Sequence, residues 1–174
     1  MGLFAGFVAL EGTIKTALLV KGTNNAPANS ANFPTFRVYS SSGYLSLNGT
    51  TTFLNSAAIT GVTLANPAVV TSNAHNLQTG NRVTITDVQG PTNANTTTTV
   101  TRLDANTFSL DGVNTSGQGA YVANTGTWNL TGAYRASVDC TAANGFVAGE
   151  NYSVLYAWTL SGVAGGDIDS WMVT

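Results

Sequence analysis

The stretch from Ile59 to Thr125 decides the fold; it reads ITGVTLANPAVVTSNAHNLQTGNRVTITDVQGPTNANTTTTVTRLDANTFSLDGVNTSGQGAYVANT. Short runs of β-branched residues alternate here with Gly, Pro and Asn, the residues that favour turns. Apolar residues recur at every second position, as at Val83 and Ile85 and again at Phe108 and Leu110. About six short strands in such a stretch predict a small barrel or sandwich rather than an open sheet.

The segments on either side of this stretch also read as strands. Phe36 and Val38 share one face of a strand, and Tyr134 and Val138 share one face of another. No segment shows sustained helical periodicity, so the sequence predicts an all-β fold. We expect a β-sandwich built from residues 1–56 and 127–174, interrupted by an inserted β-barrel-like module at residues 57–126. An insertion of this kind requires that the two ends of the insert lie close together.

Three local patterns make sharper predictions within the flanking segments. Thr13–Lys21 ends in an apolar run between two glycines, which predicts a buried strand. Asn48-Gly49 is a strong hairpin-turn signal and predicts that the strand after Tyr44 folds back there. Gly162–Gly166 reads as a turn, so the last strand is expected to begin at Asp167.

Composition and charge exclude several classes of protein. Charged residues make up only 8% of the chain, and the formal net charge is −2. The six basic residues are spread from Lys15 to Arg135 and form no cluster, so we expect no nucleic-acid partner. The apolar stretch at residues 1–10 is too short to span a bilayer, and we expect no membrane association. It is expected instead to pack against a neighbouring subunit or to form a first strand.

Candidate reactive residues are few. His75 is the single histidine, and its neighbours in sequence are amides, which are poor metal ligands. Cys140 is the single cysteine, so an intramolecular disulfide is excluded, and its place on the apolar face of a strand predicts a buried thiol. Nucleophile and phosphate-binding motifs do not occur. We therefore predict a non-enzymatic protein with no catalytic residue, no cofactor and no bound metal.

Two alternatives stay open at this point. Asp167 and Asp169 would lie on one face of the final strand and could hold calcium if Glu150 or another oxygen comes close. The three tryptophans could instead form a platform on which sugar rings stack, although their regular placement on strands favours packing in the core. They are Trp128, Trp158 and Trp171.

The stretch from Ile59 to Thr125 resembles the FCCH half-domain of ubiquitin-activating enzymes, a β-module that recurs in bacteriophage structural proteins. The resemblance begins with Asn66-Pro67, a Val-Val-Thr strand and the Ala74-His75 turn, and it continues to a Val-x-Ile strand. It ends with Ala-Asn-Thr-Phe-x-Leu at residues 105–110, followed by Gly and Tyr121. The stretch contains no cysteine, so the resemblance implies a structural module rather than ubiquitin chemistry.

The flanking segments resemble the immunoglobulin-like sandwiches of phage virion proteins. The similarity lies in Gly132-x-Tyr134, in Gly149-x-x-Tyr152-x-Val154 and in Trp171-x-Val173. The first pattern is similar to a tyrosine corner, in which a phenol hydroxyl bonds to backbone where a strand begins. In antibody-type domains a cysteine follows two residues later, and this chain has Ala136 there, so the resemblance implies a sandwich without a disulfide.

Together the two resemblances imply a structural protein of the virion. A capsid decoration or head-fibre subunit fits best, with the sandwich as anchor and the inserted module displayed. A tail, baseplate or tail-fibre component is the first alternative, and a carbohydrate-binding module that contacts the host surface is the second. The expected partners are other virion proteins, such as major capsid or tail proteins, and further copies of the chain, with a trimer expected by analogy with fibres.

Overall fold

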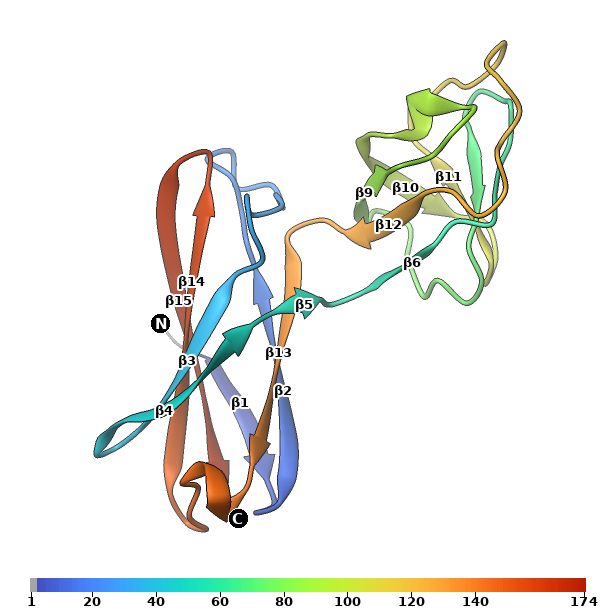
Figure 1. The fold of residues 1–174 in the computed structure, drawn as a ribbon. Coiled ribbons are helices and arrows are strands. Elements are labelled where there is room, and N and C mark those ends of the chain that lie inside the picture. The colour runs from blue at the N-terminus through green and yellow to red at the C-terminus, as the bar shows by residue number, and fades with distance from the viewer. Residues whose placement is uncertain (1–2) are drawn as a thin grey trace. The chain divides into compact units, whose positions relative to one another are not determined.

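The fold is a computed structural model that describes residues 3–174, with side chains from residue 6 onward (Figure 1). Within these residues the regular structure is strand, apart from two short 3-10 turns at Thr92–Ala94 and Ala142–Asn144. The all-β prediction is therefore confirmed.

The chain divides into two compact units. The first contains the residues up to Phe53 together with Gly132–Thr174, and the second contains Leu54–Thr131. The second unit extends a few residues beyond the expected insert at both ends. The reason is that Ser56–Ala58 and Thr127–Leu130 pair with each other and belong to the sheet of the second unit.

The first unit is a sandwich of two sheets. One sheet has the strand order β1-β15-β14-β3-β4, and the other has the order β2-β13-β5. The strands of the first sheet are β1 (Leu3–Val8), β15 (Val163–Val173), β14 (Asn151–Leu160), β3 (Thr35–Ser40) and β4 (Gly43–Thr50). Those of the second are β2 (Gly12–Leu19), β13 (Ala133–Cys140) and β5 (Thr52–Phe53).

This order is that of an immunoglobulin-like sandwich. With the insert left out, β2, β13 and β5 take the places of strands B, E and D, and β15, β14, β3 and β4 take those of G, F, C and C′. The first strand, β1, runs parallel to β15 and completes that sheet. The insert therefore lies between strands D and E.

The sandwich core forms because inward residues alternate along the strands of both sheets. In β13 the side chains of Tyr134, Ala136, Val138 and Cys140 all point inward, as the alternation predicted. In β2 the pattern is also alternating, so this strand is half-buried rather than wholly buried as expected. Leu19, within its apolar run, is 50% exposed.

Two glycines that were predicted to mark turns lie inside strands. β4 continues through Gly49, and β15 already includes Gly165. In each case an aromatic ring on the neighbouring strand covers the glycine: a Cβ added at Gly49 would lie 2.7 Å from the ring of Phe36, and one at Gly165 would lie 2.6 Å from that of Trp158. The expected hairpin at Asn48-Gly49 is therefore wrong, and so is the expected turn at Gly162–Gly166.

The turn that joins β14 to β15 is the residue pair Ser161-Gly162, where both φ angles are positive.

The tyrosine corner of the sandwich is formed by Tyr152 rather than by Tyr134. Tyr152 lies at the start of β14, the F strand, and its hydroxyl accepts a hydrogen bond from the backbone N–H of Val147 at 2.7 Å. The position two residues later, where antibody-type domains have cysteine, is therefore Val154 and not Ala136. Tyr134 lies at the start of the E strand and bonds to a distant loop.

The second unit is a barrel-like module built on one sheet with the order β6-β12-β9-β10-β11-β8-β7. Its strands are β6 (Ser56–Ala58), β7 (Gly61–Val62), β8 (Val69–Thr71), β9 (Arg82–Thr86), β10 (Thr97–Arg102), β11 (Thr107–Leu110) and β12 (Thr127–Leu130). The first half of β10 pairs with β9 and its second half pairs with β11. One strand that serves two neighbours in this way turns the sheet around its core.

The two ends of the insert are adjacent, as the insertion requires. Within the module β6 pairs with β12, and within the sandwich β5 pairs with β13. The pairing of β12 with β9 also assigns Trp128 to the core of the module, whereas the expected boundary assigned it to the sandwich.

Candidate binding pockets and the predicted site residues

His75 lies in the core of the module, where both of its ring nitrogens contact backbone. Nδ1 accepts a hydrogen bond from Leu77 N–H at 3.0 Å, and Nε2 lies 3.3 Å from the carbonyl oxygen of Thr107. The ring also packs edge-on against Phe108 and is 1% exposed. His75 therefore joins the 73–77 turn to β11, which is a structural use of the residue.

Cys140 lies at the end of β13 in the sandwich core, with no exposed surface. Burial raises the pKa of its thiol above the usual value, and the nearby Trp171 indole partly offsets this. A buried thiol with a raised pKa has little thiolate at neutral pH and is a poor nucleophile.

Asp167 and Asp169 both lie on β15, but the structure does not bring Glu150 to them. The backbone carbonyl of Glu150 accepts the N–H of Val173, so Glu150 lies beside Val173. Asp167 lies six residues before Val173 on the same strand, a separation of roughly 20 Å. Asp169 is 7% exposed, whereas Asp167 is exposed. Within residues 3–174, no three side chains of the types His, Cys, Asp or Glu gather as a metal site would require.

The three tryptophans do not form a common platform. Trp128 and Trp171 are 1% and 0% exposed, in the cores of the module and of the sandwich respectively. Trp158 is only partly buried and packs at the edge of the sandwich core. A sugar-stacking surface made of all three rings is therefore not present, and Trp158 is the one whose ring reaches solvent.

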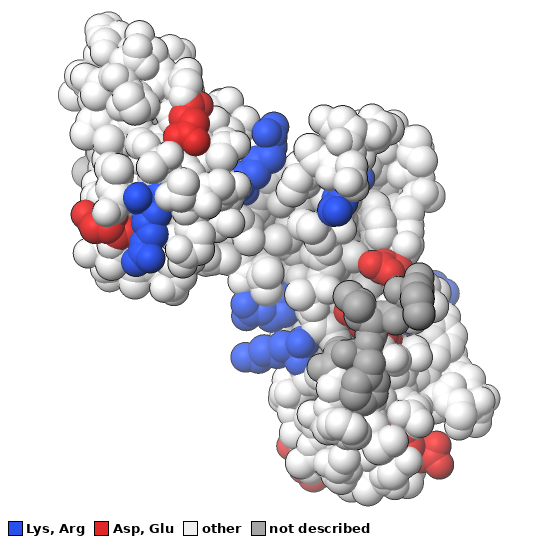
Figure 2. Space-filling model, turned by 180° about the vertical axis from the view of Figure 1, so that it is seen from behind, with Lys and Arg blue, Asp and Glu red and all other residues white. Residues whose placement is uncertain are grey.

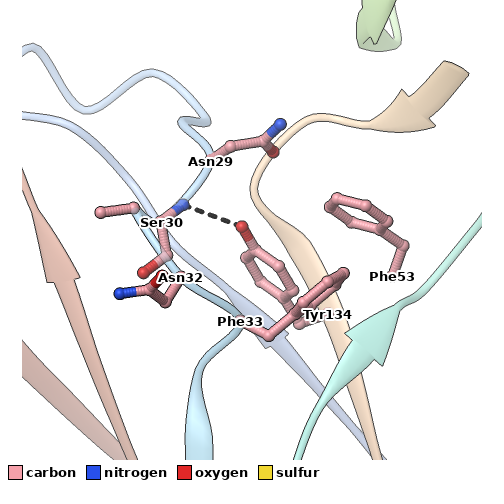
Figure 3. Close-up of a pocket in the computed structure, with 7 residues that line it drawn as sticks. Asn29, Ser30, Asn32, Phe33, Phe53 and Tyr134 are labelled. Carbon is pink, nitrogen blue, oxygen red and sulfur yellow. Dashed lines mark hydrogen bonds between the residues drawn. The ribbon is translucent and has the colours of Figure 1, made fainter. Parts of the chain in front are cut away.

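A small pocket lies beside the aromatic cluster of Tyr134, Phe33 and Phe53 (Figure 3). The Phe33 ring centroid lies 4.8 Å from that of Phe53 and 6.1 Å from that of Tyr134. The pocket holds about 270 Å³, and its remaining lining residues are Asn29, Ser30, Ala31 and Asn32.

The polar groups of this pocket are engaged within the protein. The hydroxyl of Tyr134 accepts the N–H of Ser30 at 2.8 Å (Figure 3). Oδ1 of Asn29 accepts the N–H of Gly132 at 2.7 Å. These bonds join the loop before β3 to the start of β13. The volume is also below the range of about 300–1,000 Å³ that is usual for ligand sites. We regard this pocket as part of the structural joint of the sandwich.

A larger groove lies elsewhere in the sandwich, and no pattern in the sequence predicts it. It holds about 560 Å³ and lies between the loop 21–28 and the β14–β15 hairpin. Trp158 on the hairpin was considered as a sugar contact, but the loop that faces it gave no signal because its Asn, Ala and Pro residues have no periodicity.

The surface of the protein carries few charges. The face in Figure 2 is largely uncharged, with small groups of basic or acidic side chains between wide neutral areas. This pattern follows from a composition in which only 8% of the residues are charged. None of the helical turns among residues 3–174 is long and apolar enough to cross a membrane.

Comparison with known proteins identifies the module. Residues 65–129 match the family model of the FCCH domain of ubiquitin-activating enzyme E1, and this range lies within the second compact unit. No curated protein matches the chain. The FCCH domain is a non-catalytic part of those enzymes, and the match covers the module only. The chain thus contains an FCCH-like β-module inserted in an immunoglobulin-like sandwich.

Proposed function

We propose that this protein is a non-enzymatic structural component of a bacteriophage virion, where it acts as a capsid decoration or head-fibre subunit. The observation that supports this most is the insertion of an FCCH-like module between strands D and E of an immunoglobulin-like sandwich. Both ends of the insert continue as paired strands in each unit. The sandwich and the module are thus joined by two adjacent chain segments. Such a connection suits a sandwich that binds to the virion and a module that it displays.

The scarcity of charge supports a role in repeated contacts between subunits. A surface with few charges gains little solubility from repulsion between molecules, and it can be covered by neighbours with little cost of desolvation. The chain of 174 residues has a formal net charge of only −2, and 8% of its residues are charged. Such a surface suits an assembled particle, and we propose a cyclic homo-oligomer, a trimer, bound to a major capsid or tail protein.

The location in the virion is tested by removing the protein. Virions from a phage that lacks this gene should be imaged beside the parent by cryo-electron microscopy. Loss of density from the capsid surface, with tails intact, is expected. If capsids are unchanged and the tail, baseplate or tail fibre loses density, the tail alternative is correct. If neither changes, the virion proposal is wrong.

The oligomeric state is a separate test. Light scattering coupled to size-exclusion chromatography on the purified full chain should give three times the chain mass of 17.9 kDa. A monomer at the concentrations found in a virion layer would contradict the trimer but not the location.

A further inference from the structure

The groove beside Trp158 has the form of a ligand site. Its volume of about 560 Å³ is within the usual range for small-molecule sites. Trp158, Leu160 and Val163 form one wall, and the stretch from Lys21 to Asn24, with Ala28, forms the other. Val163 is 69% exposed, so the apolar wall is open to solvent.

The walls of the groove are held in place by hydrogen bonds. On the loop side, Gly22 N–H donates to Ala26 O at 2.9 Å, and the Ala26 N–H donates to Oδ1 of Asn24 at 3.2 Å. The hydroxyl of Ser30 donates to the carbonyl of Thr159 at 2.9 Å and so connects the loop to β14. A site that is already ordered loses little conformational entropy when a ligand binds.

The ring of Trp158 is fixed by the glycine that it covers. An added Cβ at Gly165 would lie 2.6 Å from both Nε1 and Cε2 of the indole, so the ring lies almost in contact with this part of the β15 backbone. The tip of the hairpin is a two-residue turn at Ser161-Gly162, whose positive φ angles match the twist of the two strands that it joins. Trp158 is thus presented as a fixed aromatic surface and not as a mobile side chain.

The chemistry of the lining selects the ligand. Lys21 is the one charged residue that lines the groove, and the other polar lining side chains are the neutral Thr23, Asn24 and Ser161. A highly charged ligand would find too few opposite charges, and a wholly apolar ligand would leave the hydroxyl and amide groups unpaired. A pyranose ring offers an apolar C–H face for the indole and hydroxyls for the polar rim.

We propose that this groove binds a neutral oligosaccharide, with one sugar ring stacked on Trp158. Asn24, Ser161 and the ammonium group of Lys21 supply hydrogen bonds to its hydroxyls. The site uses one tryptophan from the sandwich and needs neither Trp128 nor Trp171. The inference does not depend on the virion assignment.

The experiment is a titration of the full chain with maltohexaose, cellohexaose and chitohexaose, followed by tryptophan fluorescence and by calorimetry. Trp128 and Trp171 are buried, so a change in emission on sugar binding reports mainly on Trp158. At least one hexasaccharide is expected to bind. Trp158→Ala should weaken that binding about tenfold or more, as expected for an aromatic anchor at the centre of a site.

Two further variants separate binding from folding. Val163→Asp lies on an exposed rim, leaves the core intact and should weaken binding. Phe33→Ala removes an exposed ring from the smaller pocket and should leave the affinity unchanged. If none of the three sugars binds, or if Trp158→Ala binds as well as the parent, the proposal is wrong. The oligomeric mass of Val163→Asp identifies one alternative. If no sugar binds and this variant changes the oligomeric mass, the groove is a contact between subunits and the sugar proposal is wrong.

Discussion

The indole N–H of Trp128 donates a 2.8 Å hydrogen bond to the hydroxyl of Ser72, deep in the core of the FCCH-like module. Ser72 in turn donates to the carbonyl of Ala58 at 2.9 Å, so one serine joins β12 to the segment that begins the module. Neither Ser72 nor Trp128 is more than 1% exposed. The last strand of the insert and its first are therefore connected through the core as well as through the sheet.

Ser72→Ala should destabilise the module. The substitution leaves the buried indole N–H and the Ala58 carbonyl without this partner, and a buried unsatisfied group costs roughly 1–3 kcal/mol. Native-state hydrogen exchange should show faster exchange at the amides of β9 and β12, with the β13 and β14 amides unchanged. Ser116→Ala, at an exposed position of the module, is the control. Equal exchange in the variant and the parent would show that the bond contributes nothing.

Tyr152→Phe should destabilise the sandwich by removing its tyrosine corner. The Val147 N–H would lose its acceptor while the aromatic packing against Phe146 is retained. We expect a loss of roughly 1 kcal/mol in the free energy of unfolding, measured by urea denaturation. Exchange should accelerate in β14 and not in the module. A variant as stable as the parent would mean that water replaces the hydroxyl at no cost.

Gly49→Ala should destabilise the sandwich although Gly49 lies in a strand, where alanine is normally the better residue. The new methyl group would lie 2.7 Å from Cζ of Phe36 and would force the ring out of its place in the core. Overpacking of this kind costs about 1–3 kcal/mol, which thermal denaturation would detect. Gly119→Ala is the matched control, because its Cβ would meet nothing closer than 3.5 Å. Equal melting temperatures for the two variants would contradict the account.

Gly49 and Gly165 show how far the fold can be predicted from the sequence alone. Alternation gave the inward faces of β3 and β13 correctly, because that pattern is local and has a period of two. Gly49 and Gly165 were taken for turns because the rings that cover them come from a neighbouring strand. Cross-strand pairing depends on register, and register is set by the whole sheet.

Long-range pairing also explains the remaining differences. Trp128 was assigned to the wrong unit because the boundary was expected before Thr127, whereas Thr127–Leu130 pairs with β9, some forty residues earlier. The Trp158 groove could not be predicted, since its two walls lie more than a hundred residues apart in the chain. The structural use of His75 was expected from its amide neighbours, which cannot ligate a metal well.

The phenol of Tyr156 should make the stability of the sandwich fall at high pH. Burial raises its pKa to about 12, while the hydroxyl hydrogen-bonds to that of Thr16. Below pH 10 the phenol is neutral in both the folded and the unfolded chain, so it adds no pH dependence. Between pH 10 and about 12 the unfolded chain loses this proton and the folded chain keeps it, which favours unfolding.

The test for Tyr156 is a spectrophotometric titration of the tyrosines at increasing pH, beside a stability profile. Tyr156 should ionise late, and so should Tyr134, because burial raises the pKa of both phenols. Tyr156→Phe should lose part of the late phase and show a shallower fall in stability above pH 10. If every tyrosine ionises together while the protein stays folded, the assigned burial of Tyr156 is wrong.

The thiol of Cys140 should react only when the sandwich opens. It has no exposed surface, and burial raises its pKa, so both access and thiolate content are low in the folded state. Reaction with a chromogenic disulfide reagent should be slow in buffer and fast in guanidinium chloride, with one thiol per chain. Tyr152→Phe should accelerate the reaction in buffer because it loosens the same unit, whereas Ser72→Ala should not. Rapid stoichiometric labelling of the folded parent would contradict the position of Cys140 in the core.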